Sequence, residues 1–261
     1  MSNEKKYPTD LTDEQWEEIE PLLPSRKKTG RPPNDRRNLV NAILYIVRAG
    51  CAWPLLPREY GSHKTAWDNF DKWSKKGIWA AINDALRARV RSKAGKRSRP
   101  TAAILDSQSV KSADQAGERG FDGGKKIKGI KRFLLVDTLG LILSIFVAPA
   151  NEPERSGGQK LLSKALGWLW WARLIWVDQG YNGPEFAKWV RSQKPKLEVE
   201  VVEKEPNQKG FAVQKRRWVV ERTFGWLMKH RRLVRNYEAK TRNAESFAYV
   251  AMIGVMLRRL A

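Results

Sequence analysis

Two short apolar runs, each ending in an aspartate, constrain the fold of this chain more than any other feature. Residues 102–106 read AAILD and residues 174–178 read LIWVD. Runs of this length and composition are typical of strands buried in a sheet, and residues 107–112 are expected to continue the first strand. Because functional groups gather at the carboxyl ends of strands in α/β sheets, Asp106 and Asp178 are expected to lie together.

A third acidic group lies on a helical pattern further along the chain. Val220, Phe224 and Leu227 share one face at i, i+4 and i+7. Glu221 is about 100° round from that face, at the margin of the apolar stripe. Taken alone, Glu221 is more simply half of a surface ion pair with Arg217, and an aspartate after a strand is more simply a turn residue.

Taken together, the three carboxylates have a chemical interpretation. Converging carboxylates repel one another unless a cation neutralises them, and hard oxygen ligands suit Mg²⁺ or Mn²⁺. Two such ions about 3.5–4 Å apart can activate a water or a 3′-hydroxyl and stabilise the leaving oxygen of an in-line displacement. Such a site needs no histidine base. The two histidines and the single cysteine, Cys51, do not make a zinc site.

The charge balance indicates a polyanionic partner. The chain has 261 residues and a net charge of +22, spread over both halves, so nucleic acid is the simplest partner. A ribosome-like or a membrane-surface protein is the alternative. With one cysteine no internal disulfide can form, and no apolar run is long enough to cross a membrane. We expect a cytoplasmic protein.

Residues 1–95 are predicted to form a helical DNA-binding domain. Thr12 with Gln15 has the pattern of a capping box, and Asp35 and Ser62 are candidate caps of later helices. A basic, Gly- and Pro-rich linker separates the first two helices, and a basic link at 92–99 marks the domain boundary. The predicted helices run from Thr12 to Pro24, from Asp35 to Gly50, over 63–76 and over 78–93.

The second and third of these helices suggest a helix-turn-helix-like DNA reader. Trp67, Phe70 and Trp73 would form the buried face of helix 63–76. Its opposite face would enter a groove of DNA and would contact it through Lys64, Thr65, Asn69 and Lys72. The alternative, equally open, is a helical bundle whose lysines are merely solvated.

Residues 96–261 are predicted to form the second domain, with a mixed sheet flanked by helices. A Gly-rich loop at 117–129 is expected to be flexible, with Lys125, Lys126 and Lys128 against phosphates. It is not a Walker loop. Asp137 is expected to be a turn residue of a hairpin between strands 132–136 and 141–147, and not catalytic.

The remaining elements follow from local patterns. Residues 151–158 are predicted to be a loop, and helices are expected at 159–170, from Pro184 to about 192, and at 244–260. A strand is expected at 197–202. Four tryptophans are predicted to be core residues near the second buried strand, namely Trp168, Trp170, Trp171 and Trp176.

An ordered set of motifs covers nearly the whole chain. In sequence they are LTDEQW (11–16), GRPP (30–33), ILDSQSV (104–110), GGKKIKG (123–129), LVDTLG (135–140), DQGY (178–181), VERTFGWL (220–227) and RRL (231–233). On these motifs the chain resembles the DDE transposases of bacterial insertion sequences, in the branch called the insertion-sequence-five family.

The resemblance implies an RNase H-like catalytic domain with Asp106, Asp178 and Glu221 as a metal-binding triad. It implies two Mg²⁺ or Mn²⁺ ions, cleavage of DNA at terminal inverted repeats, strand transfer into a target, and a homodimer that holds two ends. In the related insertion-sequence-four pattern, Tyr, Arg and Lys surround the glutamate. Here only the Arg is matched, by Arg217. Gln214 and Met228 replace the Tyr and the Lys, and Lys229 follows one position later. Phosphate contacts are predicted for Arg217, Arg222 and Lys229.

Two other functions remain open from the sequence. One is a DNA-binding regulator derived from a transposase and lacking catalysis. The other is a metal-dependent nuclease of the same fold that hydrolyses DNA without joining it.

Overall fold

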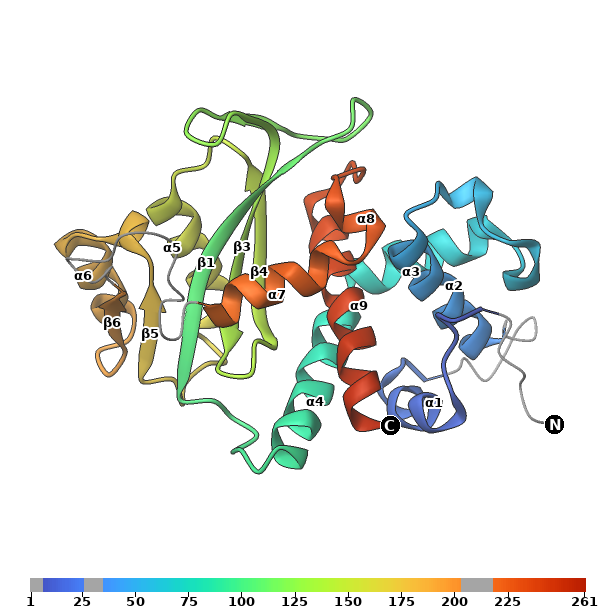
Figure 1. Ribbon diagram of the computed structural model, residues 1–261. Coiled ribbons are helices and arrows are strands. Elements are labelled where there is room, and N and C mark those ends of the chain that lie inside the picture. Colours follow the sequence, from blue (N-terminus) through green and yellow to red (C-terminus); the bar gives the residue numbers. More distant parts are fainter. Residues whose placement is uncertain (1–6, 26–34, 203–217) are drawn as a thin grey trace.

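The computed structural model describes residues 7–25, 35–202 and 218–261 (Figure 1). Its N-terminal region is helical, as predicted, and consists of α1 (Asp13–Ile19), α2 (Arg36–Ala49), α3 (His63–Lys75) and α4 (Ile78–Lys93). The predicted caps are confirmed. Thr12 forms the capping box with Gln15, Asp35 accepts two backbone N–H bonds, and Ser62 accepts one from Thr65. The linker at 26–34 lies outside the described residues.

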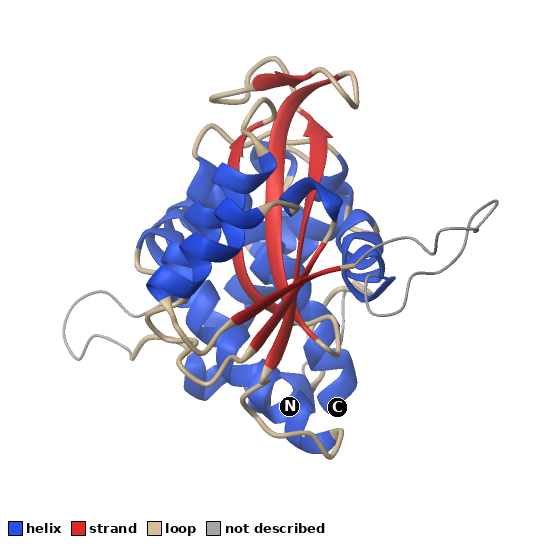
Figure 2. Cartoon of the chain, turned by 90° about the vertical axis from the view of Figure 1, so that its left-hand side faces the viewer, coloured by secondary structure: helices blue, strands red, loops and turns tan. Residues whose placement is uncertain are grey.

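A mixed sheet follows the helical region. Its strands are β1 (Ala102–Lys111), β2 (Gly120–Asp122), β3 (Ile127–Asp137), β4 (Ile142–Pro149), β5 (Leu174–Val177) and β6 (Glu198–Val201). The order is β2-β3-β1-β5-β6, with β4 also paired to β3. β3 is antiparallel to β1 and β4, whereas β1, β5 and β6 run parallel. Figure 2 shows the twisted strands with helices on both sides.

Alternate residues of the strands face two different hydrophobic clusters. Leu105 and Phe133 face α5 (Glu154–Ala165) and α6 (Pro184–Gln193). Ile104 and Leu134 face the other side, which is covered by α7 (Trp218–Met228), α8 (Arg231–Val234) and α9 (Thr241–Leu260). The alternation follows from the two-residue period of a strand.

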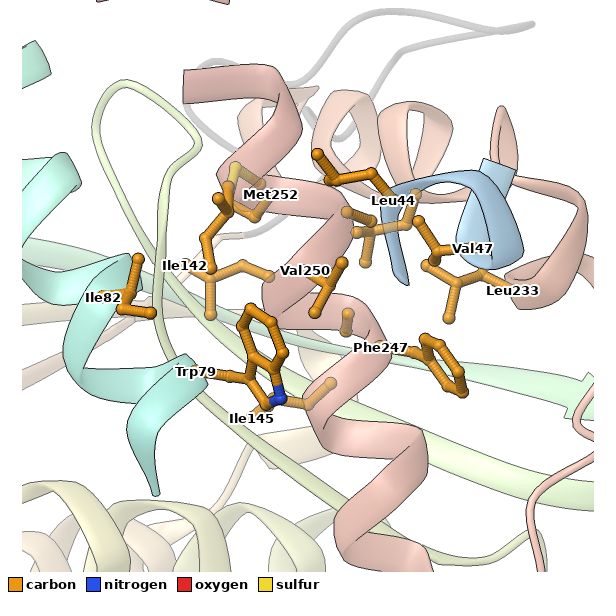
Figure 3. Close-up of a cluster of buried hydrophobic side chains, with 14 of the residues drawn as sticks. Leu44, Val47, Trp79, Ile82, Ile142, Ile145, Leu233, Phe247, Val250 and Met252 are labelled. Atoms are coloured by element: carbon orange, nitrogen blue, oxygen red, sulfur yellow. The ribbon is translucent and has the colours of Figure 1, made fainter. Parts of the chain in front are cut away.

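One hydrophobic core crosses the boundary that the sequence suggests. α9 lies between the sheet and the N-terminal helices (Figure 1) and is buried along most of its length. In Figure 3, Val47 of α2, Trp79 of α4 and Ile145 of β4 meet around Phe247 and Val250 of α9. The division at residues 95 and 96 stays a prediction, but the two parts share their packing.

Helix α5 differs from its prediction by five residues at each end. It begins at Glu154, inside the predicted loop, and ends at Ala165, before the whole tryptophan cluster. The reason is packing. A Cβ at Gly157 would lie 2.1 Å from the Phe133 ring, and one at Gly158 would lie 2.6 Å from Tyr181. The glycine pair lets the helix approach the sheet closely, and it does not mark a loop.

The glycine-rich segment at 117–129 is only partly a loop. β2 and the start of β3 form a hairpin there, with a turn at residues 123–126 (Figures 1 and 2). The prediction of a loop over the whole segment was wrong because cross-strand pairing, which the local composition does not reveal, makes residues 120–122 and 127–129 strands.

Some expected core tryptophans are exposed. Trp67 is 37% exposed and Trp170 is 60% exposed, whereas Trp176 is buried as predicted. Trp168 and Trp171 are half-buried. No helix among the described residues is both long and apolar enough to span a bilayer.

Candidate active site

The pairing of β1 with β5 brings Asp106 and Asp178 to the same level of the sheet. Ile104 pairs with Trp176. Asp106 lies two residues after Ile104, and Asp178 lies two residues after Trp176. Ile104 and Trp176 both belong to the core beneath α7 and α9, so the aspartates that share their alternation face the same side. Neighbouring strands lie about 4.8 Å apart, so the two carboxylates are neighbours.

The backbone around each aspartate holds its carboxylate. Asp106 is buried, and its Oδ1 accepts the N–H of Ser107 at 2.6 Å. Asp178 follows β5, and its Oδ1 accepts the N–H of Gly180 at 3.0 Å. Asp178 ends its strand as predicted. The predicted continuation of the first strand beyond Asp106 is also confirmed, because antiparallel pairing with β3 carries β1 on to Lys111.

A further carboxylate and a tyrosine, neither predicted from the sequence, lie beside this pair. Glu154 Oε1 accepts from Ser107 Oγ at 3.2 Å. Burial raises the pKa of Tyr181 well above its usual value, and the negative charges of Asp106, Glu154 and Asp178 raise it further. The Tyr181 hydroxyl is therefore neutral, and it has no hydrogen-bond partner among the described residues. Glu154 was missed because residues 151–158 looked like a loop.

Glu221 lies in the first turn of α7, on the same side of the sheet as the two aspartates. Val219 and Val220 pack into the core that contains Ile104, while Glu221 is exposed. The apolar line Val220, Phe224 and Leu227 is buried as predicted. Among the described residues, no three His, Cys, Asp or Glu side chains are close enough to hold a metal ion. The structure thus brings the two aspartates together, but its described residues do not form a cluster of three metal ligands.

Arg222 stacks between two tryptophans of α7. Its guanidinium carbon lies 4.3 Å from the centre of the Trp218 ring and 4.7 Å from that of Trp226. It also donates to the carbonyl oxygen of Leu139 at 3.0 Å. These contacts give Arg222 a role within the fold, and its predicted phosphate contact stays a prediction. Arg217 and Gln214 lie outside the described residues.

The basic residues of the β2–β3 hairpin are exposed. These are Lys125, Lys126 and Lys128. Lys125 points towards the candidate site, because its Nζ lies 4.0 Å from Glu154 Oε1. Lys126 has a φ of 52°, in the left-handed region that non-glycine residues seldom adopt.

Helix α3 presents part of its predicted DNA-facing surface. Lys64 and Lys72 are exposed, whereas Thr65 and Asn69 are half-buried and linked, with Asn69 Nδ2 donating to the Thr65 carbonyl at 2.9 Å. The connection from α2 to α3, residues 50–62, contains two 3-10 turns. It is longer than the three- or four-residue turn of the helix-turn-helix motif.

Comparison with known proteins agrees with this architecture. Residues 97–256 match the family described as "Transposase DDE domain", and residues 11–83 match "Putative transposase of IS4/5 family (DUF4096)". The chain is 33% identical over 116 residues to an uncharacterized 16.2 kDa protein of insertion element IS402 from Burkholderia cepacia, covering 42% of this chain and 77% of that protein. It is 30% identical over 69 residues to the uncharacterized protein y4sN of Sinorhizobium fredii (strain NBRC 101917 / NGR234), covering 26% and 55%.

The mixed sheet with helices on both faces is the RNase H-like architecture of a DDE domain, and it carries a helical region in front. The chain belongs to the IS4/5 family of DDE transposases.

Proposed function

We propose that this protein binds the terminal inverted repeats of an insertion sequence, cleaves DNA at those ends and joins the 3′-hydroxyl to a target. The observation that carries the proposal is the common level of Asp106 and Asp178 on adjacent parallel strands, beneath the helix that bears Glu221. Carboxylates grouped at one level of an open α/β sheet are typical of a catalytic site.

The donor chemistry of these residues fits a divalent cation. Asp106 and Asp178 offer neighbouring carboxylate oxygens, the ligand type that Mg²⁺ and Mn²⁺ prefer. Glu221 is the acidic group of the helix above them. Two ions held there would activate the attacking oxygen and stabilise the leaving oxygen of phosphoryl transfer.

The side chains around the carboxylates have separate tasks in this proposal. The N–H groups of Ser107 and Gly180 orient the two aspartates. Glu154 lies between Ser107 and Lys125, so it holds the hairpin lysine near the site. The neutral hydroxyl of Tyr181 can donate a hydrogen bond to one of the surrounding carboxylates.

Substitution of the three acidic residues tests the proposal. We expect Asp106→Asn, Asp178→Asn and Glu221→Gln to abolish Mg²⁺-dependent cleavage and strand transfer while DNA binding stays near the wild-type level. Asp114→Asn is the matched control, because the Asp114 side chain is fully exposed. Cleavage at the wild-type rate by any one of the three variants would remove that residue from the mechanism.

A cysteine substitution tests metal contact directly. Thiolate is a softer ligand than carboxylate and suits Mg²⁺ poorly. Asp106→Cys is therefore expected to be inactive with Mg²⁺ and to recover part of its cleavage with Mn²⁺. Equal inactivity in both metals, in a protein that melts like the wild type, would argue against Asp106 as a ligand.

The alternative functions predict different products. A regulator without catalysis would bind cognate ends and leave them uncut in Mg²⁺. A nuclease of the same fold would cut them but would not join pre-nicked ends to a plasmid target. Synapsis of two ends also requires two active sites, so we propose a homodimer on DNA, which the mass of the complex would test.

A further inference from the structure

A cationic cleft opens where three distant helix ends meet. Its volume is about 900 Å³, and the ends of α2, α7 and α9 line it together with residues 7–11. Its basic side chains are Arg48, Lys229, His230, Arg258 and Arg259. We use the name cationic cleft for this feature.

The structure shows no ion pair for the arginines and the lysine of the cleft within the residues that it describes. The four side chains concerned are Arg48, Lys229, Arg258 and Arg259. The acidic residue of the lining is Asp10, which accepts from the Tyr60 hydroxyl at 2.6 Å and from the Tyr7 N–H at 3.1 Å. Arg48, Lys229 and Arg258 are exposed, so their positive charges face the solvent of the cleft.

The basic groups of the cleft lower one another's pKa values. Burial lowers the pKa of Arg258, and the charge of Arg48 lowers it further. Burial also lowers the pKa of His230 to about 4, and Arg48 and Arg258 act in the same direction. Arg48 Nη1 is bound to the Lys229 carbonyl at 2.5 Å, which holds α2 against the end of α7. Several positive charges that line one cleft favour the binding of an anion.

A stack of alternating aromatic and guanidinium groups connects the cleft to the candidate active site. The order is Trp218, Arg222 and Trp226 along α7, followed by Arg259 of α9, whose guanidinium carbon lies 4.6 Å from the Trp226 ring centre. Trp218 is 40% exposed and lies one turn from Glu221. A strand that leaves the site along α7 would reach the cleft.

We propose that the cationic cleft binds the sugar-phosphate backbone of DNA that flanks the cleavage point. The inference rests on the proposed DNA substrate but not on the roles of the three acidic residues. The excess of positive charge in the lining favours a nucleic acid backbone over a protein partner. Contacts to the backbone carry no sequence information, so the cleft would strengthen binding uniformly.

Neutralising two cleft arginines tests the proposal in the full-length protein. The variants are Arg48→Gln, Arg258→Gln and the double variant, and the matched control is Arg191→Gln, an exposed residue of α6. The probe is duplex DNA with an inverted-repeat end, compared with an unrelated duplex of equal length. Binding is measured from 50 to 300 mM salt, and thermal melting checks that each variant is folded.

The expected result is a uniform loss of affinity. Each lost phosphate contact weakens binding about 5- to 10-fold near 0.1 M salt and lowers the salt slope by about 0.9, so the double variant should lose about two units of slope. The proposal is overturned if the double variant binds like Arg191→Gln, or if only the inverted-repeat duplex is affected.

The same measurements separate this inference from the proposed function. Wild-type affinity in the cleft variants, with cleavage lost in Asp106→Asn, would reject the cleft and leave the function standing. Weakened binding in the cleft variants, with no cleavage by the wild-type protein, would support the cleft and reject the catalytic proposal.

Discussion

Two cavities of nearly equal size differ in whether the basic residues that line them form ion pairs. The cationic cleft measures about 900 Å³, and a second cavity beside the edge strand β4 measures about 970 Å³. We call the second one the β4 cavity. Three of its four cations are paired with carboxylates: Arg87 with Asp84, Lys164 with Glu245 and Arg242 with Asp71. The fourth, Arg99, lies over the rings of Trp170 and Trp171. The two cavities therefore differ in how many of their cations have a carboxylate partner, and not in volume.

The paired cations also tie elements of the fold together. Glu245 of α9 accepts the N–H of Val147 at 3.1 Å and the ammonium of Lys164 at 2.9 Å. Asn83 of α4 donates to the Ile142 carbonyl at 2.8 Å. These side chains satisfy groups on the outer edge of β4, which would otherwise be open to pairing with another chain.

The largest loss of stability is expected on substitution of a buried cation that forms an ion pair. Arg91 of α4 binds Asp137 at 2.7 Å, and the two side chains are 5% and 0% exposed. Asp137 also accepts the N–H groups of Leu139 and Leu141, which confirms it as a turn residue. Arg91→Met leaves a buried carboxylate without its countercharge, so we expect a loss of about 3–5 kcal/mol in unfolding free energy, measured by denaturant titration.

The double variant Arg91→Met with Asp137→Asn is the control for that measurement. The asparagine oxygen can still accept the turn N–H groups while the uncompensated charge is gone. The double variant should therefore recover part of the lost stability. If it is no more stable than Arg91→Met, the charge pair is not the cause.

The second largest effect on stability is expected at His230 of the cationic cleft, and it depends on pH. The pKa of His230 is lowered from 6.5 to about 4 in the folded protein, so the unfolded chain binds the proton more readily. Stability should therefore be lost as the pH falls from about 6.5 to about 4, by up to about 3 kcal/mol. In His230→Gln the loss over this window should be smaller, as measured by denaturant titration at several pH values. An identical pH dependence in the two proteins would exclude His230 as its source.

The smallest loss of stability is expected on substitution of an ion-pair residue that lines the β4 cavity or binds one of its cations. Glu245→Gln weakens the ion pair with Lys164 but keeps an acceptor for the Val147 N–H, so we expect a loss of only about 1 kcal/mol. Lys164→Gln should leave the affinity for duplex DNA and its salt slope unchanged. A loss of slope in Lys164→Gln equal to that of a cleft variant would remove the distinction between the two cavities.

Local signals predicted most of the elements correctly. The caps Thr12, Asp35 and Ser62 act within three residues along the chain, and so does the left-handed Gly50, with a φ of 73°, that ends α2. The strand ending in Asp178 and the helix starting at Pro184 follow from equally short patterns. Such interactions are complete within a single turn or strand, so the sequence alone reveals them.

The wrong predictions share a cause. Gly157 and Gly158 indicated a loop, but they are small residues at a contact between a helix and the sheet. The glycines of 117–129 indicated a loop throughout, but Gly120 and Gly129 pair with each other across a hairpin. In each case the glycine is needed for a contact with a residue that lies elsewhere in the chain.

The two aspartate-bearing strands and the helix with Glu221 could be predicted because each is carried by a short run of residues. The basic character follows from composition, and the family resemblance follows from the order of short motifs along the chain. No local pattern showed that α9 joins the N-terminal helices to the sheet, or that Arg48, Lys229 and Arg258 line one cleft. The reason is physical. Packing and charge proximity depend on distances through space, and residues far apart along the chain acquire them only when the core forms.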